Sequence, residues 1–199
     1  MDAFWGDRST LRALDGLKCK GNWLASRPRY VRETWGEGMF SRVAEALEPR
    51  ERQYFEKPPL PFGWHPFRSL CRIDEQIFEL AMRRDLESMR TFGGAMTDYD
   101  LNVVYRTFFR LGTPEFLLSK THLLWRQYAS GGRLKPTVTK GAAAIEFTEV
   151  AVPRYLCAYG ICGYLTAATV AAGGTRVRVE HASCVHAGDA ACRYEVRWE

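Results

Sequence analysis

The chain lacks any long uninterrupted apolar stretch. Its best run of small and apolar residues, Ala167 to Gly174, falls well short of the roughly eighteen residues that indicate a membrane-spanning helix. The first residues also lack the apolar core of a secretory signal peptide. We therefore expect a soluble cytoplasmic protein with no transmembrane segment.

Cysteine is too sparse for a scaffold built on disulfides, because the 199 residues include only six. With 46% hydrophobic residues, a chain of this length can bury one sizeable core by itself. No internal repeat or low-complexity tract suggests otherwise. We expect residues 1–17 to form a loosely attached amino-terminal arm and residues 18–199 to form a single domain.

Positive charge is neither large nor concentrated. The net charge is +5, with 28 basic residues set among 23 acidic ones. The densest basic stretch, Arg27 to Arg32, is followed by Glu33 and Glu37, which is typical of a solvated helix face. No helix-turn-helix or zinc-finger spacing accompanies it. We therefore expect no direct binding of nucleic acid.

Motifs that carry catalysis are also missing. Neither Gly93-Gly94 nor Gly131-Gly132 has the strand-turn-helix context of a phosphate cradle, and no nucleophile elbow or dinucleotide fingerprint occurs. The histidines are dispersed over a Pro-rich loop, a helix, a strand and an exposed turn: His65, His122, His181 and His186. We expect no catalytic residue and no enzymatic activity.

Helical periodicity dominates residues 26 to 130. Pro28 is expected near a helix start, and residues 67–81 carry apolar side chains at helical spacing. The prolines of residues 57–66 exclude a helix there. A further helix is expected over residues 113–128, because Thr can cap its amides, Pro fits its first turn and Glu complements its dipole.

Strands dominate the last third of the chain. Residues 133–139 and 142–149 can pair around Lys140-Gly141, Pro153 opens a helix that reaches about Ala172, and a second hairpin follows. This order predicts an α+β fold, in which a helical amino-terminal half packs on a four-stranded antiparallel sheet made of two hairpins with one crossover helix.

The final hairpin is the most informative part of the sequence. Residues 176–181 and 192–198 alternate apolar and polar side chains, which predicts two half-buried strands. Cys184 and Cys192 stand at the ends of the turn between them. The alternation points His181 and Cys192 inward together, so one imidazole and two thiols gather at one end of the hairpin, where they could hold a metal ion.

This ending resembles the carboxyl-terminal signature of the vinyl-reductase-like (4-vinyl reductase) domain. That small-molecule-binding module belongs to the superfamily of transport-particle subunits and haem nitric-oxide-binding domains. Its pattern is a cysteine, a helix, a glycine and two cysteines around a seven-residue turn, which Cys157, Gly174, Cys184 and Cys192 follow in order. A longer resemblance, over residues 18–198, is to a paralogous family of unknown function expanded in myxobacteria. It rests on the hairpin and on segments 17–21, 64–66 and 110–118.

The resemblance implies a metal site made of Cys157, His181, Cys184 and Cys192. Phenol-responsive sensors of this family place a carboxylate where His181 stands, and an imidazole is an equally good ligand. Zinc favours four tetrahedral thiolate and imidazole ligands, so we expect a structural zinc ion. The alternative is a set of buried free thiols. Haem is not expected, because the Tyr-x-Ser-x-Arg signature of the haem-binding relatives is absent.

The resemblance also implies an apolar cavity between helices and sheet, closed by aromatic rings and one or two polar groups. The candidate ligand-binding residues are Trp125, Tyr128, His122, Tyr105 and Phe109. The alternative is that these side chains simply pack the core.

These features predict a non-catalytic sensory or signalling module that binds a small apolar or aromatic molecule. It would act as a homodimer or through a separate signalling partner. One alternative is a tetrapyrrole-pathway carrier or reductase-associated protein, by analogy with the bacteriochlorophyll-pathway member of the family. Another is a protein-interaction module. The absence of a nicotinamide or flavin motif favours the first interpretation.

Overall fold

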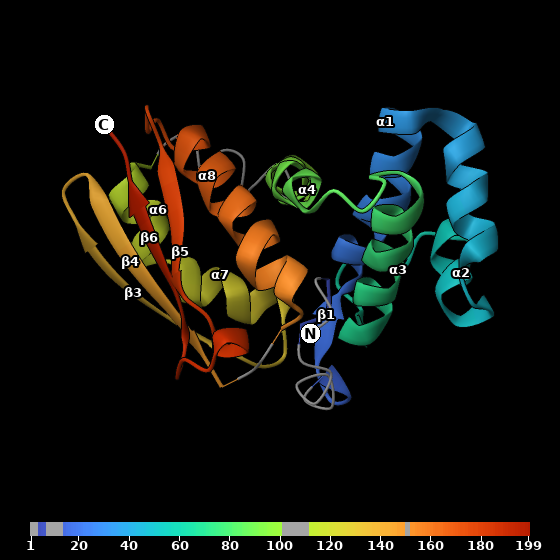
Figure 1. The fold of residues 1–199 in the computed structure, drawn as a ribbon, viewed down its shortest axis with the longest axis horizontal. Coiled ribbons are helices and arrows are strands. Elements are labelled where there is room, and N and C mark those ends of the chain that lie inside the picture. The colour runs from blue at the N-terminus through green and yellow to red at the C-terminus, as the bar shows by residue number, and fades with distance from the viewer. Residues whose placement is uncertain (1–3, 7–13, 101–111, 150–151) are drawn as a thin grey trace.

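The computed structural model describes residues 4–6, 14–100, 112–149 and 152–199. Figure 1 shows a helical half on the right, containing α1, α2 and α3, and a sheet half on the left. Helix α4 lies between them and faces α8 of the sheet half. The predicted α+β class is confirmed. Within the described ranges no helix is both long and apolar enough to cross a membrane.

The helical half starts with a short strand rather than directly with a helix. Its first long helix begins at Gly21, so the expectation that Pro28 marks a helix start is wrong and Pro28 lies inside the helix. The backbone bends at Gly36, where φ is 79°. The elements of this half are β1 (Lys18–Lys20), α1 (Gly21–Ala46), α2 (Pro49–Glu56), β2 (Trp64–Pro66), α3 (Phe67–Leu80) and α4 (Leu86–Asp100).

The Pro-rich segment between α2 and α3 is not helical, as predicted. Its last three residues form β2, which pairs antiparallel with β1, and Cys19 lies opposite His65. This two-stranded sheet fixes the entry to α3. Neither strand was expected, because three residues are too few to show a period of two.

Two short helices precede the main sheet in the chain. Thr113 caps the first, since its hydroxyl accepts the Phe116 amide at 3.3 Å, and Pro114 occupies the first helical position. The single helix expected here is interrupted at Lys120, which separates α6 (Pro114–Ser119) from α7 (Thr121–Tyr128). Both helices pack on the first strand of the sheet.

The main sheet has the strand order β3-β4-β6-β5 and is antiparallel throughout. It consists of the two predicted hairpins, β3 (Arg133–Thr139) with β4 (Ala142–Thr148) and β5 (Arg178–Ser183) with β6 (Cys192–Arg197). The predicted crossover helix begins with a π-helical turn, η2 (Tyr155–Gly160), and continues as α8 (Ile161–Ala171).

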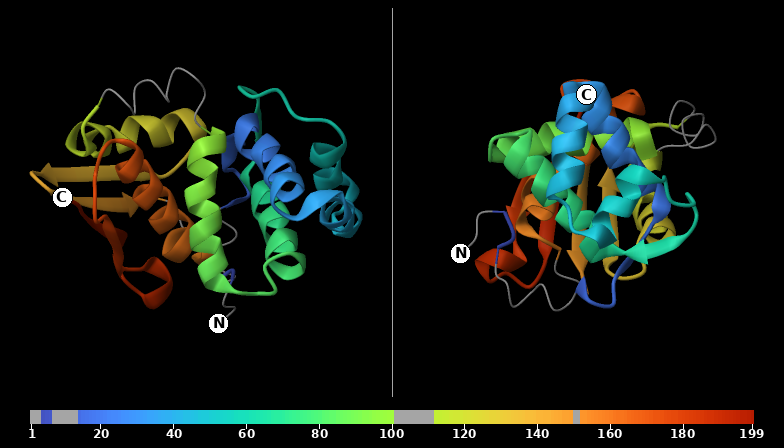
Figure 2. Two further views of the ribbon diagram at one scale, coloured as in Figure 1. Left: turned by 90° about the horizontal axis from the view of Figure 1, so that it is seen from above. Right: turned by 90° about the vertical axis from the view of Figure 1, so that its right-hand side faces the viewer.

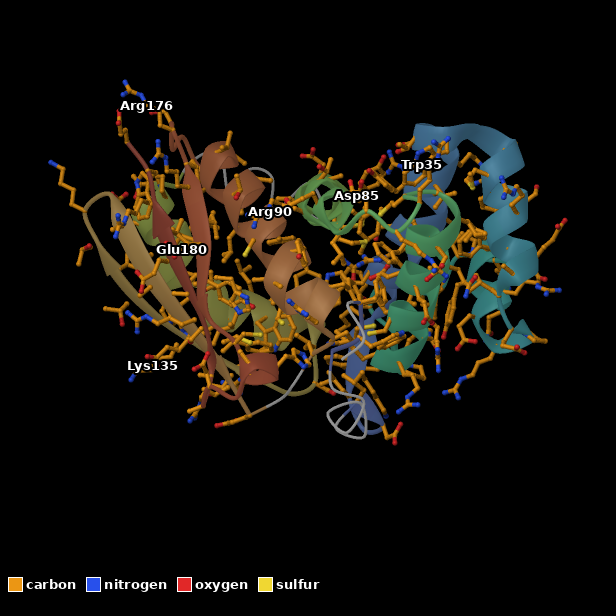
Figure 3. The ribbon with its side chains drawn as sticks, viewed as in Figure 1. Trp35, Asp85, Arg90, Lys135, Arg176 and Glu180 are labelled. Carbon is orange, nitrogen blue, oxygen red and sulfur yellow. The ribbon has the colours of Figure 1, made fainter. Side chains whose placement is uncertain are left out.

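One face of the sheet is apolar and the other is charged. Ile145, Phe147 and Tyr194 are buried beneath the helices. On the other face, Arg193 pairs with the carboxylates of neighbouring residues on β4 and β6. Figure 3 shows Lys135 of β3 extending away from the helices. Such alternation is typical of an antiparallel sheet covered on one side.

The amino-terminal arm is attached to the core. Phe4 and Trp5 are buried, and the Phe4 ring stacks on Tyr155 with centroids 4.2 Å apart. The Tyr155 amide also donates to the Phe4 carbonyl at 2.8 Å. The expectation of loose attachment is therefore wrong at these residues, because two aromatic side chains are removed from water there. The boundary at residue 18 stays a prediction.

Candidate metal centre and interior cavity

Four side chains from three parts of the chain converge at the end of the second hairpin. The ligand atoms of Cys157, His181, Cys184 and Cys192 all lie within 4.8 Å of one another. Cys157 is on η2, His181 on β5 and Cys192 at the start of β6. The four residues that the sequence suggested as metal ligands are thus brought together.

The turn between β5 and β6 shapes this cluster. A short 3-10 helix, η3 (Val185–Ala187), follows Cys184, and Gly188 then takes a φ of 97°. The Asp189 carboxylate accepts the Cys184 amide at 2.8 Å. These local bonds hold Cys184 beside Cys157, and their sulfur atoms are 3.8 Å apart.

The thiols have unequal pKa values. The Cys157 thiol donates to its neighbours and His181 adds a further hydrogen bond, so the pKa of Cys192 is lowered to about 4. The same donor lowers the pKa of Cys184 to about 6. The pKa of Cys157 is raised, because its proton is shared with Cys184 and Cys192. The surroundings therefore favour the thiolate, the form that binds metal, at Cys184 and Cys192, while Cys157 keeps its proton in the absence of metal.

The dimensions fit a tetrahedral zinc ion. With Zn–S bonds of about 2.3 Å, two thiolates of a tetrahedral site lie about 3.8 Å apart. The Cys157–Cys184 separation is 3.8 Å. The buried Nε2 atom of His181 has no hydrogen-bond partner among the described residues. The cluster could therefore hold a metal ion such as zinc, and four protein ligands would leave no position for a substrate.

His186, in the same turn, was expected to be exposed, but it is buried. Only 6% of its surface is accessible, and its Nε2 lies 2.8 Å from the Val152 carbonyl. A Cβ at Gly6 would come within 2.5 Å of the ring, so the amino-terminal arm covers this histidine. The imidazole of His186 therefore links the hairpin turn to the segment before η2, and it does not belong to the metal cluster.

An apolar cavity of about 130 Å³ lies between the helical half and the sheet half. Residues from α1, α3, α4, α7, β3, η2 and α8 line it. Its aromatic wall combines Trp23, Trp125 and Tyr128, with the Trp23 and Tyr128 rings stacked 5.6 Å apart. The Trp125 indole nitrogen donates to the Gly131 carbonyl at 2.7 Å, which fixes its ring.

The cavity has one charged wall. Arg27 and Asp74 form a buried ion pair with 3.0 Å between Nε and Oδ1, and 6% and 1% of their side chains are exposed. The Tyr155 hydroxyl donates to Asp74 Oδ2 at 2.8 Å. Burial and the Asp74 charge raise the pKa of Tyr155 well above its ordinary value. Arg27, Asp74 and Tyr155, hereafter the polar triad, all line the cavity.

The candidate ligand-binding residues divide into three groups. Trp125 and Tyr128 line the cavity, and their role in ligand binding stays a prediction. His122 is absent from the described lining, because α7 presents Thr121, Leu124, Trp125 and Tyr128 inward at helical spacing and His122 lies on another side. Tyr105 and Phe109 lie outside the described residues.

The polar triad was missed at the sequence level. Its signal was an acidic residue inside an apolar stripe: Asp74 falls between Leu70, Cys71 and Ile77, which are all buried on α3. A charge on the buried face of a helix requires a partner. The sequence did not say which of the many basic residues would supply it.

Solved structures share this arrangement of helices and sheet. The H-NOX protein from S. oneidensis in the Fe(II)NO ligation state superimposes with a TM-score of 0.67 at 13% identity, covering 90% of this chain and 99% of that one. Unliganded Fe(II) H-NOX from K. algicida gives 0.64 at 10% identity, covering 90% and 96%. A mutant of T. Tengcongensis H-NOX gives 0.57 at 16%, also covering 90% and 96%.

The chain has an H-NOX-like fold. This is the fold of the haem nitric-oxide/oxygen-binding superfamily. The resemblance of the carboxyl-terminal signature pointed to the same wider group. At such low identity the likeness concerns the fold alone. No family model and no curated protein matches the chain. The vinyl-reductase-like assignment therefore stays a prediction.

The described lining of the cavity offers neither a histidine nor a cysteine to a haem iron. None of the four histidines of the sequence lines the cavity, and its described lining contains no cysteine. Haem iron needs an axial ligand from such groups, or from Met or Tyr. The described lining includes Met89, Met96 and three tyrosines, one of which, Tyr155, donates its hydroxyl proton to Asp74. The cavity volume of about 130 Å³ is close to that of a cavity that admits benzene, roughly 150 Å³.

Proposed function

We propose that the chain is a non-catalytic sensory module that binds a small apolar or aromatic molecule in the interior cavity. The observation that carries this proposal is an apolar cavity with a single charged wall, the polar triad, at the junction of the two halves. Ligand sites combine apolar walls with a few fixed polar groups in this way. The H-NOX-like fold is consistent with a sensor.

The size of the cavity limits the ligand to about one aromatic ring. Asp74 can accept further hydrogen bonds, because a carboxylate has about four lone-pair sites. A ring that carries one hydroxyl or amino group is therefore the best fit. Because the ligand would contact α1, α3, α4 and η2 together, its binding would change how the two halves pack.

Zinc has a structural role in this proposal. Cys157, His181, Cys184 and Cys192 would hold the ion and join η2 to the second hairpin. Since η2 also carries Tyr155 of the polar triad, the metal would fix one wall of the cavity. The ion would supply cross-linking rather than catalysis.

The binding test uses phenol, aniline and benzene as probes with the intact chain. We expect phenol or aniline to bind and to be recovered unchanged. Trp125→Ala should weaken binding about tenfold, because an aromatic contact contributes roughly 0.5–1.5 kcal/mol beyond area burial. Leu123→Ala, on the exposed side of α7, is the matched control. Failure of all three probes to raise the melting temperature would contradict the proposal.

Native mass spectrometry of the freshly purified protein tests the remaining parts. It reports metal, bound small molecule and subunit number together. We propose a cytoplasmic protein that acts as a homodimer or through a separate signalling partner. A co-purifying pigment would instead favour the tetrapyrrole-carrier alternative, which the cavity volume does not support.

A further inference from the structure

Large apolar side chains are exposed together in the segment that joins α2 to β2. Leu60 is 79% exposed, Phe62 77% and Trp64 45%. Alternate residues of a five-residue stretch thus leave large apolar surfaces in water. Figure 2 shows this loop running along the edge of the molecule, beside α2. We call residues 57–64 the docking segment.

The prolines of the docking segment restrict its first residues to extended backbone, up to the tight turn at Leu60–Gly63. Proline fixes its own φ and pushes the preceding residue out of the helical region. Lys57, which precedes Pro58, has φ −141° and ψ 118°. Pro58 and Pro61 are three residues apart, which is the length of one polyproline turn. Both are exposed, whereas Pro59 between them is half-buried.

Backbone hydrogen bonds anchor the docking segment to the domain. The Gly21 amide donates to the Gly63 carbonyl and the Asn22 amide to the Pro61 carbonyl, both at 3.0 Å. A tight turn closes between Leu60 and Gly63, also at 3.0 Å. A Cβ at Gly21 would lie 2.2 Å from the Leu60 carbonyl oxygen, so only glycine allows this approach. The apolar side chains are therefore held outward by a pre-ordered backbone, which lowers the entropic cost of binding.

Two lysines flank the exposed surface. The Lys20 ammonium lies 3.8 Å from the centre of the Trp64 ring and donates to the Phe62 carbonyl at 2.9 Å. Lys57 is exposed at the other end of the segment. Positive charge at both ends complements a partner surface that carries carboxylates.

We propose that the docking segment binds a separate protein whose groove is lined by aromatic side chains and flanked by carboxylates. Grooves of this kind recognise proline-rich extended chains through two outward prolines and the apolar residues beside them. A lipid surface would use Leu60 and Phe62 but would not require two exposed prolines three residues apart. The observations therefore favour a protein groove over a membrane.

The test titrates the full-length chain with a panel of purified SH3, WW and EVH1 domains. We expect at least one of them to bind with a Kd below about 0.1 mM. The double variant Pro58→Ala/Pro61→Ala and the single variant Phe62→Ala should each weaken that binding at least tenfold. Lys57→Glu should weaken it and reduce its dependence on salt. Circular dichroism should show that these surface variants remain folded.

Two control variants show whether loss of binding is specific to the exposed residues of the docking segment. Pro59→Ala changes the inward proline, and Val170→Ala removes an exposed apolar side chain 55% accessible on α8; each should change the Kd less than threefold. The proposal is overturned if no domain of the panel binds, or if binding survives the double proline variant. Binding to phosphatidylcholine–phosphatidylserine vesicles that Phe62→Ala abolishes would assign the segment to membranes instead. A dimer in sedimentation that Phe62→Ala dissociates would assign it to self-association.

Discussion

Cys162 and Cys192 are both buried, yet the pKa values of their thiols move in opposite directions. Burial raises the pKa of Cys162 to about 11. Hydrogen bonds from Cys157 and His181 lower the pKa of Cys192 to about 4. Cys162 lies five residues beyond Cys157, which at α-helical spacing is about 140° further around, and it is not among the four residues of the cluster. The sequence alone predicted that only one of these two helical cysteines could join the site.

This contrast gives a matched pair of variants. If zinc is bound, Cys192→Ser should lower its occupancy and destabilise the domain by several kcal/mol, because the binding energy of a structural metal contributes to folding. Cys162→Ser should leave zinc occupancy unchanged. Metal analysis and thermal unfolding check both. Equal zinc contents in the two variants, or none in the wild type purified without chelator, would rule out the metal site.

A single histidine should contribute to acid sensitivity. Burial lowers the pKa of His65, whose Nδ1 lies 3.3 Å from the Tyr54 hydroxyl. The pKa of a histidine in the unfolded chain is about 6.5. Below that pH the unfolded chain binds a proton that the folded chain does not yet accept, so the free energy of unfolding decreases as the pH decreases. We expect His65→Gln to show a shallower fall between about pH 7 and pH 5. Urea unfolding across this range measures it, and parallel curves for the two proteins would contradict it.

At the scale of elements, α4 and α8 cross at glycines. A Cβ at Gly163 would lie 1.9 Å from the Arg90 carbonyl oxygen, and one at Gly93 would lie 2.2 Å from that of Gly160. These contacts are between backbones, so a neighbouring side chain cannot yield to relieve them. The junction of the two halves therefore depends on residues that lack a side chain.

Gly163→Ala should consequently destabilise the domain by about 1–3 kcal/mol, the usual cost of overpacking. Gly38→Ala is the control, because a Cβ there meets nothing within 4 Å and α1 is helical at that point. Alanine should stabilise that position by about 0.4–1 kcal/mol. The free energy of unfolding in urea separates the two, and a change of the same sign in both variants would contradict the close crossing.

The elements that the sequence predicted were those with a local signal. Alternation gave both hairpins of the main sheet, and the residues at 113–115 marked a helix start. The elements that it missed depend on contacts between distant segments. Strand β1 exists because it pairs with β2, some forty-five residues later. Likewise α1 begins at Gly21 because the backbone of the docking segment approaches there.

The site shows the same division at the scale of the whole molecule. The metal cluster could be predicted, since three of its four residues belong to one hairpin whose faces follow from alternation. The cavity could be predicted only by resemblance. Its aromatic wall included two of the candidates, Trp125 and Tyr128, but its charged wall comes from α1, α3 and η2, which no local pattern relates.

The polar triad joins the two halves of the molecule. The Asp74 carboxylate on α3 accepts hydrogen bonds from Arg27 on α1 and from Tyr155 on η2. Arg27 also donates to the Trp23 carbonyl and to the Ser26 hydroxyl, at 2.9 and 3.0 Å. Breaking a buried ion pair by removing one partner costs far more than replacing both with apolar residues.

Asp74→Ala should therefore destabilise the domain by about 3–5 kcal/mol, because Arg27 is left buried without a counter-charge. The double variant Arg27→Met/Asp74→Leu should recover most of this loss. Glu33→Gln, in the exposed pair with Arg29, should change stability little. Urea unfolding compares the three, and an Asp74→Ala loss no larger than that of Glu33→Gln would contradict the triad's role. If the double variant is stable but no longer binds phenol or aniline, the charged wall is needed for recognition rather than for folding.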